Sequence, residues 1–210
     1  NQIIRLLMAD GDEQAALFAA ADRVRRRYVG DEVHLRGLIE FSNYCSNDCH
    51  YCGLRRSNRR LVRYRLSPDE IIAAADVAVS CGYRTVVLQS GEDPYYSAAQ
   101  LGEIIRRIKA MGDIAVTMSI GLRPREDYVA LVKAGMDRYL MKQETADPVL
   151  FSKLRPGTTL AERLAGLRFL QDLGVQIGSG FMVGLPGQSV TSLADDILLL
   201  KELRVDMAGI

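Results

Sequence analysis

The sequence has no excess of charge of either sign, no long apolar run and few cysteines. Lys and Arg number 27 against 26 Asp and Glu, a formal net charge of +1, so no overall field favours nucleic acid or an anionic membrane. No apolar stretch approaches the about 20 residues of a membrane span, and no signal-like segment opens the chain. Four cysteines, three of them close together, do not resemble a disulfide framework. We therefore expect a cytoplasmic protein with reduced thiols that binds neither nucleic acid nor a membrane.

The pattern of apolar residues predicts an α/β fold. The chain has 210 residues, of which 48% are hydrophobic and 25% charged, as is ordinary for one globular domain. Continuous apolar runs alternate with amphipathic segments, which indicates a parallel sheet covered by helices. The predicted strands are 34–41, 85–91, 114–121, 138–144, 175–184 and 205–210. The predicted helices are 1–29, 67–82, 97–111, 124–134, a short one from Asp147-Pro148, 159–174 and 190–203.

Such a repeat closes either as a doubly wound open sheet or as a TIM-type (β/α) barrel. A full barrel usually needs about 250 residues, and the sixth predicted strand has no helix after it to cover it. We therefore expect a fragment of a TIM-type barrel with about six β/α units. The barrel domain would cover 31–210 without its C-terminal strands, after an N-terminal helical extension over 1–30.

Polar residues follow the predicted strands where each strand ends. The cysteines follow the first strand, "QSGED" (89–93) ends the second, Thr117 and Ser119 lie on the third, and "KQET" (142–145) ends the fourth. The fifth leads into "GLPGQS" (184–189). In β/α folds the active site lies at this edge, so five successive loops indicate one site.

Three cysteines, Cys45, Cys49 and Cys52, have the spacing C-x3-C-x2-C. A structural zinc site takes four protein ligands, and a 4Fe–4S cube normally takes four thiolates, so three would leave one iron open. His50 lies between two cysteines, where its ring would point away. Cys81 is expected on the outside of the barrel as a small buried hydrophobe. A zinc site and a purely structural cluster stay open as alternatives.

The cysteine motif, with the aromatic Tyr51 before its last cysteine, resembles that of the radical S-adenosylmethionine (SAM) superfamily. "EFSNYCSNDCHYCGLRRSN", "RYRLSPDEI", "VVLQSGEDPYY", "DRYLMKQETADPVLFSKLRPG" and "MVGLPGQ" together resemble the HydE family, the radical SAM maturases of FeFe-hydrogenases and relatives of biotin synthase and methylornithine synthase. The resemblance implies an enzyme in hydrogenase cofactor assembly. It implies a 4Fe–4S cluster that passes one electron to SAM, which yields methionine and a 5′-deoxyadenosyl radical.

The resemblance also implies roles for particular residues. Cys45, Cys49 and Cys52 would hold the cluster. The segment at Ser90 would lie along the SAM ammonium, and Arg163 would pair with the SAM carboxylate. The residues implied to bind SAM are Tyr51, Ser90, Gly91, Glu92, Glu144, Arg163 and Met182. Those associated with substrate or anion binding are Gln89, Thr117, Arg138 and Lys142, and no catalytic residue is assigned.

Two positions depart from the resemblance. The family commonly has His-Glu-Thr where this sequence has Gln143-Glu144-Thr145, and an arginine in place of Lys142. We expect both to lie beside the substrate cavity and to bear on the substrate. The implied partners are a small-molecule or organometallic substrate, an electron donor such as ferredoxin or flavodoxin, and other hydrogenase maturation proteins.

Other functions remain open at this point. One is a methylornithine synthase-like or other biotin-synthase-related radical SAM enzyme. Another is a scaffold that holds iron–sulfur or zinc without catalysis, although such a scaffold has no need of Glu144 and Arg163. The arginine-rich stretch "RRSNRRLVRYR" (55–65) is expected to be a solvated loop with ion pairs near the cluster, and not a nucleic-acid site.

Overall fold

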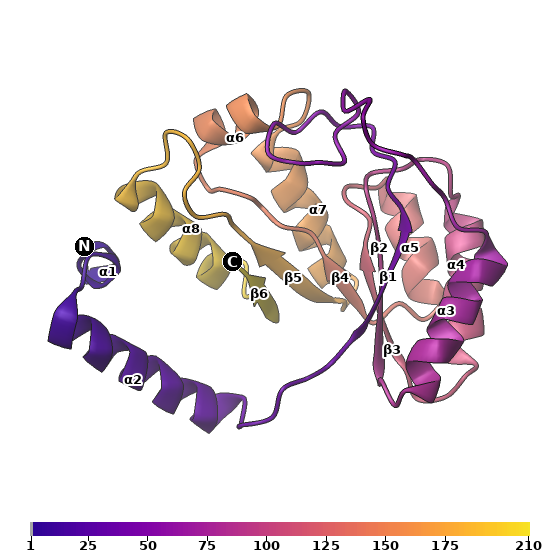
Figure 1. The fold of residues 1–210 in the computed structure, drawn as a ribbon, viewed down its shortest axis with the longest axis horizontal. Coiled ribbons are helices and arrows are strands. Elements are labelled where there is room, and N and C mark those ends of the chain that lie inside the picture. The colour runs from indigo at the N-terminus through magenta and orange to yellow at the C-terminus, as the bar shows by residue number, and fades with distance from the viewer. Residues whose placement is uncertain (1) are drawn as a thin grey trace.

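The fold is one parallel β-sheet with helices on its outer face. The computed structural model describes residues 2–210, and Figure 1 shows its arrangement. The strands are β1 Gly37–Ser42, β2 Thr85–Ser90, β3 Ala115–Ser119, β4 Arg138–Leu140, β5 Gln176–Gly180 and β6 Met207–Gly209. They pair in sequence order, all parallel. Because the order never reverses, the sheet follows a barrel and not a doubly wound sheet.

The helices are α1 Gln2–Leu7, α2 Gly11–Tyr28, α3 Pro68–Ser80, α4 Ala98–Lys109, α5 Arg125–Lys133, α6 Pro148–Leu154, α7 Leu160–Asp172 and α8 Val190–Glu202. The two capping boxes expected from the sequence are present: Ser67 with Glu70 begins α3, and Thr159 with Glu162 begins α7. No helix among residues 2–210 is long and apolar enough to cross a membrane.

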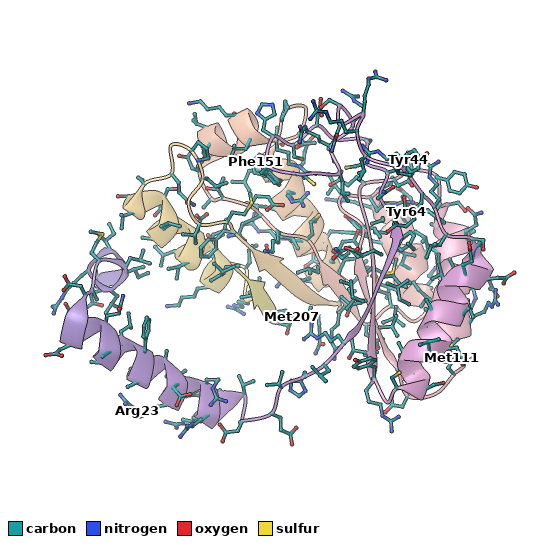
Figure 2. All side chains as sticks on the ribbon, viewed as in Figure 1. Arg23, Tyr44, Tyr64, Met111, Phe151 and Met207 are labelled. Carbon is teal, nitrogen blue, oxygen red and sulfur yellow. The ribbon has the colours of Figure 1, made fainter. Side chains whose placement is uncertain are left out.

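Alternate residues along each strand separate the core from the inner face of the sheet. Ile39, Leu88 and Met118 are buried in the apolar core, which Figure 2 shows filled with side chains between the sheet and its helices. Their neighbours point to the other face, because side chains alternate along a strand. There Gln89 is paired in register with Glu40 on β1 and with Ser119 on β3. The inner face of the sheet is therefore polar near its carboxyl end.

Several predicted elements are shorter than expected. The helix predicted over 1–29 is two helices, and Gly11, with φ 49°, begins the second. The fourth strand ends at Leu140, not at 144, and Glu144 has φ 69°, outside the extended conformation of a strand. Helix α1 contacts α8, whereas no residue of α2 is buried, and Figure 1 shows α2 apart from the sheet. The domain division at residue 30 stays a prediction.

Candidate active site

The cysteines lie on one loop, residues 43–64, which we call the cysteine loop. Figure 1 shows it passing over the carboxyl ends of the strands towards α6. The backbone N–H and the hydroxyl of Ser46 both donate to the Glu92 carbonyl oxygen, at 2.9 and 3.0 Å. The His50 N–H donates to the Leu154 carbonyl oxygen at 2.9 Å. These bonds fix the loop to the segment after β2 and to the end of α6.

Gly91 lets the cysteine loop approach the end of β2. A Cβ atom at this position would lie 2.2 Å from the Tyr44 carbonyl oxygen and 2.7 Å from Cys45 Cβ. Gly121, with φ 73°, has a similar role, since a Cβ there would lie 1.9 Å from Glu92 Cγ. Because neither place has room for a side chain, both glycines are required by the packing around the cysteines and Glu92.

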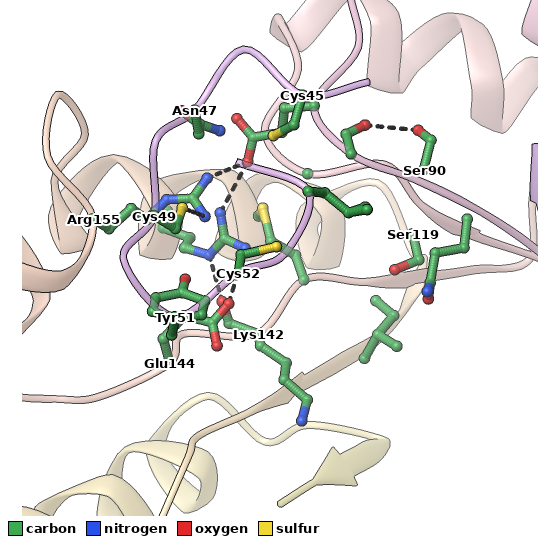
Figure 3. A pocket seen from close by; sticks show the side chains of 18 residues that line it. Cys45, Asn47, Cys49, Tyr51, Cys52, Ser90, Ser119, Lys142, Glu144 and Arg155 are labelled. Atoms are coloured by element: carbon green, nitrogen blue, oxygen red, sulfur yellow. Dashed lines mark hydrogen bonds and ion pairs between the residues drawn. The ribbon is translucent and has the colours of Figure 1, made fainter. Parts of the chain in front are cut away.

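All three cysteines line one pocket of about 240 Å³ at this edge of the sheet. Figure 3 shows them beside Tyr51, Ser90, Lys142 and Glu144. The predicted site residues that line the pocket are Cys45, Cys49, Tyr51, Cys52, Gln89, Ser90, Gly91, Glu92, Lys142, Glu144 and Arg163. The structure therefore brings together residues from the loops after β1, β2 and β4 and from α7.

Glu92 is an ionised carboxylate between two buried arginines. Its Oε1 accepts from Arg155 Nη2 and, at 3.2 Å, from Arg163 Nη1. The side chains of Glu92, Arg155 and Arg163 are 15%, 7% and 8% exposed. Burial acts to raise the pKa of Glu92, but the two guanidinium groups outweigh it and the pKa is lowered. Glu92 is therefore held charged, at the cost of desolvating three groups.

The Glu144 carboxylate lies in the same pocket, and within residues 2–210 its one ion pair is long. Its Oε1 is 3.8 Å from Arg163 Nη2, and its side chain is 13% exposed. Burial raises its pKa despite the nearby positive charges. Burial and the Glu144 carboxylate also raise the pKa of Tyr51, whose buried hydroxyl has no hydrogen-bond partner in the part of the chain that the structure describes. With its left-handed backbone, Glu144 is a strained and poorly satisfied group, which is typical of functional positions.

Arg163 connects the two carboxylates to the backbone after β4. Its Nε donates to the Lys142 carbonyl oxygen, while its two Nη atoms face Glu92 and Glu144. Arg163 comes from the first turns of α7 and is buried. Lys142 lines the pocket, and Figure 3 shows its side chain pointing away from the thiols. No hydrogen bond or ion pair of its ammonium is found within residues 2–210. The pocket thus contains two acidic and three basic side chains.

Three predicted site residues lie outside this pocket. Arg138 is at the opposite edge of the sheet, where its Nε donates to Gln176 Oε1 at 2.7 Å and its Nη1 to Thr85 Oγ1 at 3.3 Å. Thr117 is buried in mid-strand, and among residues 2–210 its hydroxyl has no hydrogen-bond partner. Met182 follows β5, and its N–H donates to the Glu144 carbonyl oxygen at 3.0 Å. Met182 is thereby hydrogen-bonded to a residue that lines the pocket.

Two sequence-based expectations were wrong. Gln143 does not face the pocket: it is fully buried, accepts from Ser179 Oγ at 2.8 Å and donates to the Asp196 carbonyl oxygen at 3.3 Å. The chain has left β4 at Leu140 and bends at Glu144, so residues 142–144 no longer follow a strand. In this segment Gln143 faces α8, whereas Lys142 and Glu144 line the pocket. Cys81 is exposed and not buried, because it is the C-cap residue of α3 and lies past the helix's packed turns.

Sequence reasoning missed Arg155. Its Nε donates to Thr158 Oγ1 at 3.0 Å, its Nη1 to Cys49 Sγ at 3.4 Å and its Nη2 to Glu92. One feature of the sequence could have indicated a functional role for Arg155. It lies between the end of α6 and Pro156-Gly157, in the stretch "DRYLMKQETADPVLFSKLRPG" that resembles the HydE family. Burial raises the pKa of the Cys49 thiol, and the adjacent Arg155 opposes that shift.

The thiols fit a cluster better than a single metal ion. In the described part of the chain, no three His, Cys, Asp or Glu side chains converge closely enough to hold one metal ion, as a zinc site requires. Cys81 lines a separate hollow with His34 and Arg138 at the other edge of the sheet. Three thiols from one loop around one pocket match the donors of a 4Fe–4S cube whose fourth iron takes another ligand.

Comparison with known proteins agrees with this site. The model of the radical SAM superfamily matches residues 39–200. The chain is 55% identical over 195 residues to the [FeFe] hydrogenase maturase subunit HydE of Thermotoga maritima, covering 93% of this chain and 56% of that protein. It is 29% identical over 207 residues to 3-methylornithine synthase of Methanosarcina acetivorans, covering 98% and 59%. The chain thus spans little more than half the length of these relatives.

Solved structures show the same fold. The crystal structure of methylornithine synthase (PylB) superposes with a TM-score of 0.90 at 29% identity, covering 98% of this chain and 61% of that one. The FeFe-hydrogenase maturase HydG from Carboxydothermus hydrogenoformans gives 0.84 at 28% identity, covering 98% and 50%. From the match over residues 39–200 and the shared fold, the chain belongs to the radical SAM superfamily.

Proposed function

We propose that this chain forms the SAM-cleaving barrel of an enzyme that acts in FeFe-hydrogenase maturation. The observation that carries the proposal is the pocket where three thiols of one loop meet Glu144 and Arg163. Superfamily membership assigns a 4Fe–4S cluster and SAM as cofactors. The 55% identity to HydE supports the maturation role.

The residues of the pocket would divide the work of binding. Cys45, Cys49 and Cys52 would hold the cluster, which when bound supplies one electron to SAM, so that methionine and a 5′-deoxyadenosyl radical form. Arg163 would bind the SAM carboxylate through its planar fork. Glu144 would accept hydrogen bonds from SAM. The buried side chains of Arg155, Arg163 and Cys49 would help to keep water from the reactive product.

The remaining SAM contacts come from three loops. The backbone at Ser90, Gly91 and Glu92 would lie along the SAM ammonium. Tyr51 would lie beside the adenine, and its unpartnered hydroxyl is free to bond a ligand. Met182 would bring the backbone after β5 against the nucleoside, which agrees with its bond to Glu144.

The substrate would bind deeper, on the inner face of the sheet. Gln89 and Lys142 line the pocket, and Thr117 has a buried hydroxyl free for a ligand. The unpaired Lys142 ammonium favours a small molecule or an organometallic compound with negative charge. Arg138, at the far edge, could touch only a substrate that extends along the inner face.

The partners and compartment belong to the same proposal. An electron donor such as ferredoxin or flavodoxin would reduce the cluster, and other hydrogenase maturation proteins would receive the product. The cytoplasm suits cysteines that must stay reduced, since structural disulfides are rare there. Residues 31–210 would be the barrel domain and 1–30 its helical extension.

A second candidate is a methylornithine synthase-like enzyme. The TM-score of 0.90 to PylB favours it, whereas the higher sequence identity favours HydE. Both cleave SAM in this proposal and differ in the substrate. A scaffold without catalysis would not need Arg163 and Glu144 buried beside the thiols.

The cluster assignment is tested on the full-length protein, reconstituted anaerobically. We expect one oxygen-sensitive 4Fe–4S cluster per chain, measured by iron and sulfide content and by EPR after reduction. The variant with Cys45→Ser, Cys49→Ser and Cys52→Ser should lose it, while Cys81→Ser should keep it. If the triple variant retained the parent's reduced-cluster signal, these cysteines would not be the ligands.

A further inference from the structure

We propose that Arg56, Arg59 and Arg60, which we call the basic face, form the docking surface for an acidic one-electron donor protein. The inference rests on the proposed function, because it concerns how electrons reach the cluster.

The cysteine loop carries an uneven charge. It contains five arginines and a single acid, Asp48, although the whole chain has a net charge of only +1. The Asp48 carboxylate accepts from the Ser57 N–H at 3.0 Å. We expected ion pairs along this stretch, and for the basic face that expectation was wrong.

The three arginines of the basic face are exposed. In residues 2–210 none of their guanidinium groups has a hydrogen bond, and none lies within 4.0 Å of a carboxylate. The buried carboxylate of Asp93 is paired with Arg65, which is not part of the basic face. Unpaired cations in water carry little cost. They are therefore free to meet a partner's carboxylates, and their charge extends into solvent.

The other arginines of the stretch hold the loop in shape. Arg63 donates to the carbonyl oxygens of Asn43, Leu54 at 3.0 Å and Arg55 at 2.8 Å, and so joins both ends of the loop. Arg65 donates to both oxygens of Asp93 at 2.7 and 3.0 Å. This division of roles leaves the basic face presented on a fixed loop, and not on a freely moving segment.

The basic face lies directly beside a cluster ligand. A surface hollow of about 390 Å³ is lined by Tyr44, Cys45, Arg56, Asn58, Arg59, Leu61 and Arg63. Cys45 also lines the main pocket. Val62, 85% exposed, adds an apolar side chain next to the arginines, as protein interfaces have a mixed apolar and charged surface. A protein docked here would come close to Cys45 without blocking the SAM pocket.

The chemistry of the partner follows from these facts. The electron step needs a donor that gives up one electron, such as a reduced flavin or iron–sulfur protein, which is oxidised by one electron as the cluster gains it. A donor with carboxylates around its redox centre would be drawn to the basic face, since complementary charge mainly raises the rate of association. A small anion could also enter the hollow, and the experiment separates the two.

The test uses an acidic flavodoxin with the full-length protein. Oxidised flavodoxin is titrated to give a dissociation constant, and reduced flavodoxin is mixed with the cluster-loaded protein to give a reduction rate. The variant with Arg56→Glu, Arg59→Glu and Arg60→Glu should bind at least about tenfold more weakly and be reduced at least about tenfold more slowly at low salt. A milder variant with Gln at the same positions should lie between it and the parent.

A matched control changes charge elsewhere by the same amount. Arg23→Glu, Arg27→Glu and Lys201→Glu alter exposed residues of α2 and α8, and Figure 2 shows Arg23 far from the cysteine loop. The control should behave within about twofold of the parent, and added salt should slow the parent more than the basic-face variant. Dithionite should reduce the parent, the two basic-face variants and the control to the same EPR intensity.

The outcomes are distinct. Equal binding and reduction of the parent and the basic-face variant, or an equal loss in the control, would overturn the docking surface alone. Inorganic phosphate is titrated in parallel. If the basic-face variant bound phosphate more weakly but kept the parent's flavodoxin binding and reduction rate, the hollow would be an anion site and not a donor site. A parent that took up no cluster would contradict the proposed function as well.

Discussion

Two isosteric changes in the pocket should have opposite effects on stability. Glu92→Gln removes the charge that faces Arg155 and Arg163, both buried, and leaves two guanidinium groups without their carboxylate. Removing one partner of a buried ion pair costs about 3–5 kcal/mol. Glu144→Gln instead removes a buried charge whose nearest guanidinium atom is 3.8 Å away. Its free energy of unfolding should stay within about 1 kcal/mol of the parent or rise.

The pH dependence of the free energy of unfolding gives a second test of the same two variants. The pKa of Glu92 is lowered in the folded protein, so its stabilisation is present above the unfolded value of about 4.3 and is lost as the pH falls through the folded pKa. The difference between parent and Glu92→Gln should therefore shrink below about pH 4. The pKa of Glu144 is raised, so any gain from Glu144→Gln should be largest at neutral pH and fade in acid.

The assay is urea denaturation of the cofactor-free, full-length protein, followed by circular dichroism. If the urea midpoint shifts while the dependence of the unfolding free energy on urea concentration stays the same, the variant has changed the stability and not the unfolded state. The reasoning would be refuted if Glu92→Gln unfolded within about 1 kcal/mol of the parent, or if Glu144→Gln lost as much as Glu92→Gln.

Two further changes test the SAM contacts and the loop. Arg163→Met should weaken SAM binding by about 2–5 kcal/mol and leave the cluster intact. The loss should exceed that of Glu144→Gln, with binding measured from the EPR spectrum of the cluster as SAM is titrated. Binding as strong as the parent's would rule out this pocket. Gly91→Ala would place a Cβ 2.2 Å from the Tyr44 carbonyl oxygen and should therefore lower the cluster content. The control Gly53→Ala should keep the parent's cluster content, because no atom lies within 4 Å of a Cβ there. Equal iron content in both variants would show that the close approach at Gly91 is unimportant.

The sequence predicted the order and type of the strands and of all helices from α3 onwards. The capping residues Ser67 and Thr159 signalled helix starts through local chemistry, and apolar runs signalled buried strands. The end of β4 could not be predicted, because the bend at Glu144 is set by its tertiary surroundings and not by local propensity. The break between α1 and α2 was missed because a glycine inside an apolar-periodic stretch is only a weak signal.

The candidate site was predicted in part. Spacing marked the three cysteines, and the resemblance marked Glu144 and Arg163. Arg155 was missed because its partners Glu92 and Cys49 are 63 and 106 positions away in the chain. Gln143 was expected beside the cavity because the predicted strand ran on to residue 144, whereas β4 ends at Leu140.

The account's central claim is that this pocket binds SAM against an iron–sulfur cluster and cleaves it. The most direct measurement is formation of 5′-deoxyadenosine and methionine by the full-length, cluster-loaded protein under anaerobic reduction. We expect both products in equal amounts, together with a change in the EPR spectrum of the reduced cluster when SAM is added. A fully loaded and reduced protein whose EPR spectrum ignored SAM and which formed no 5′-deoxyadenosine would contradict the claim.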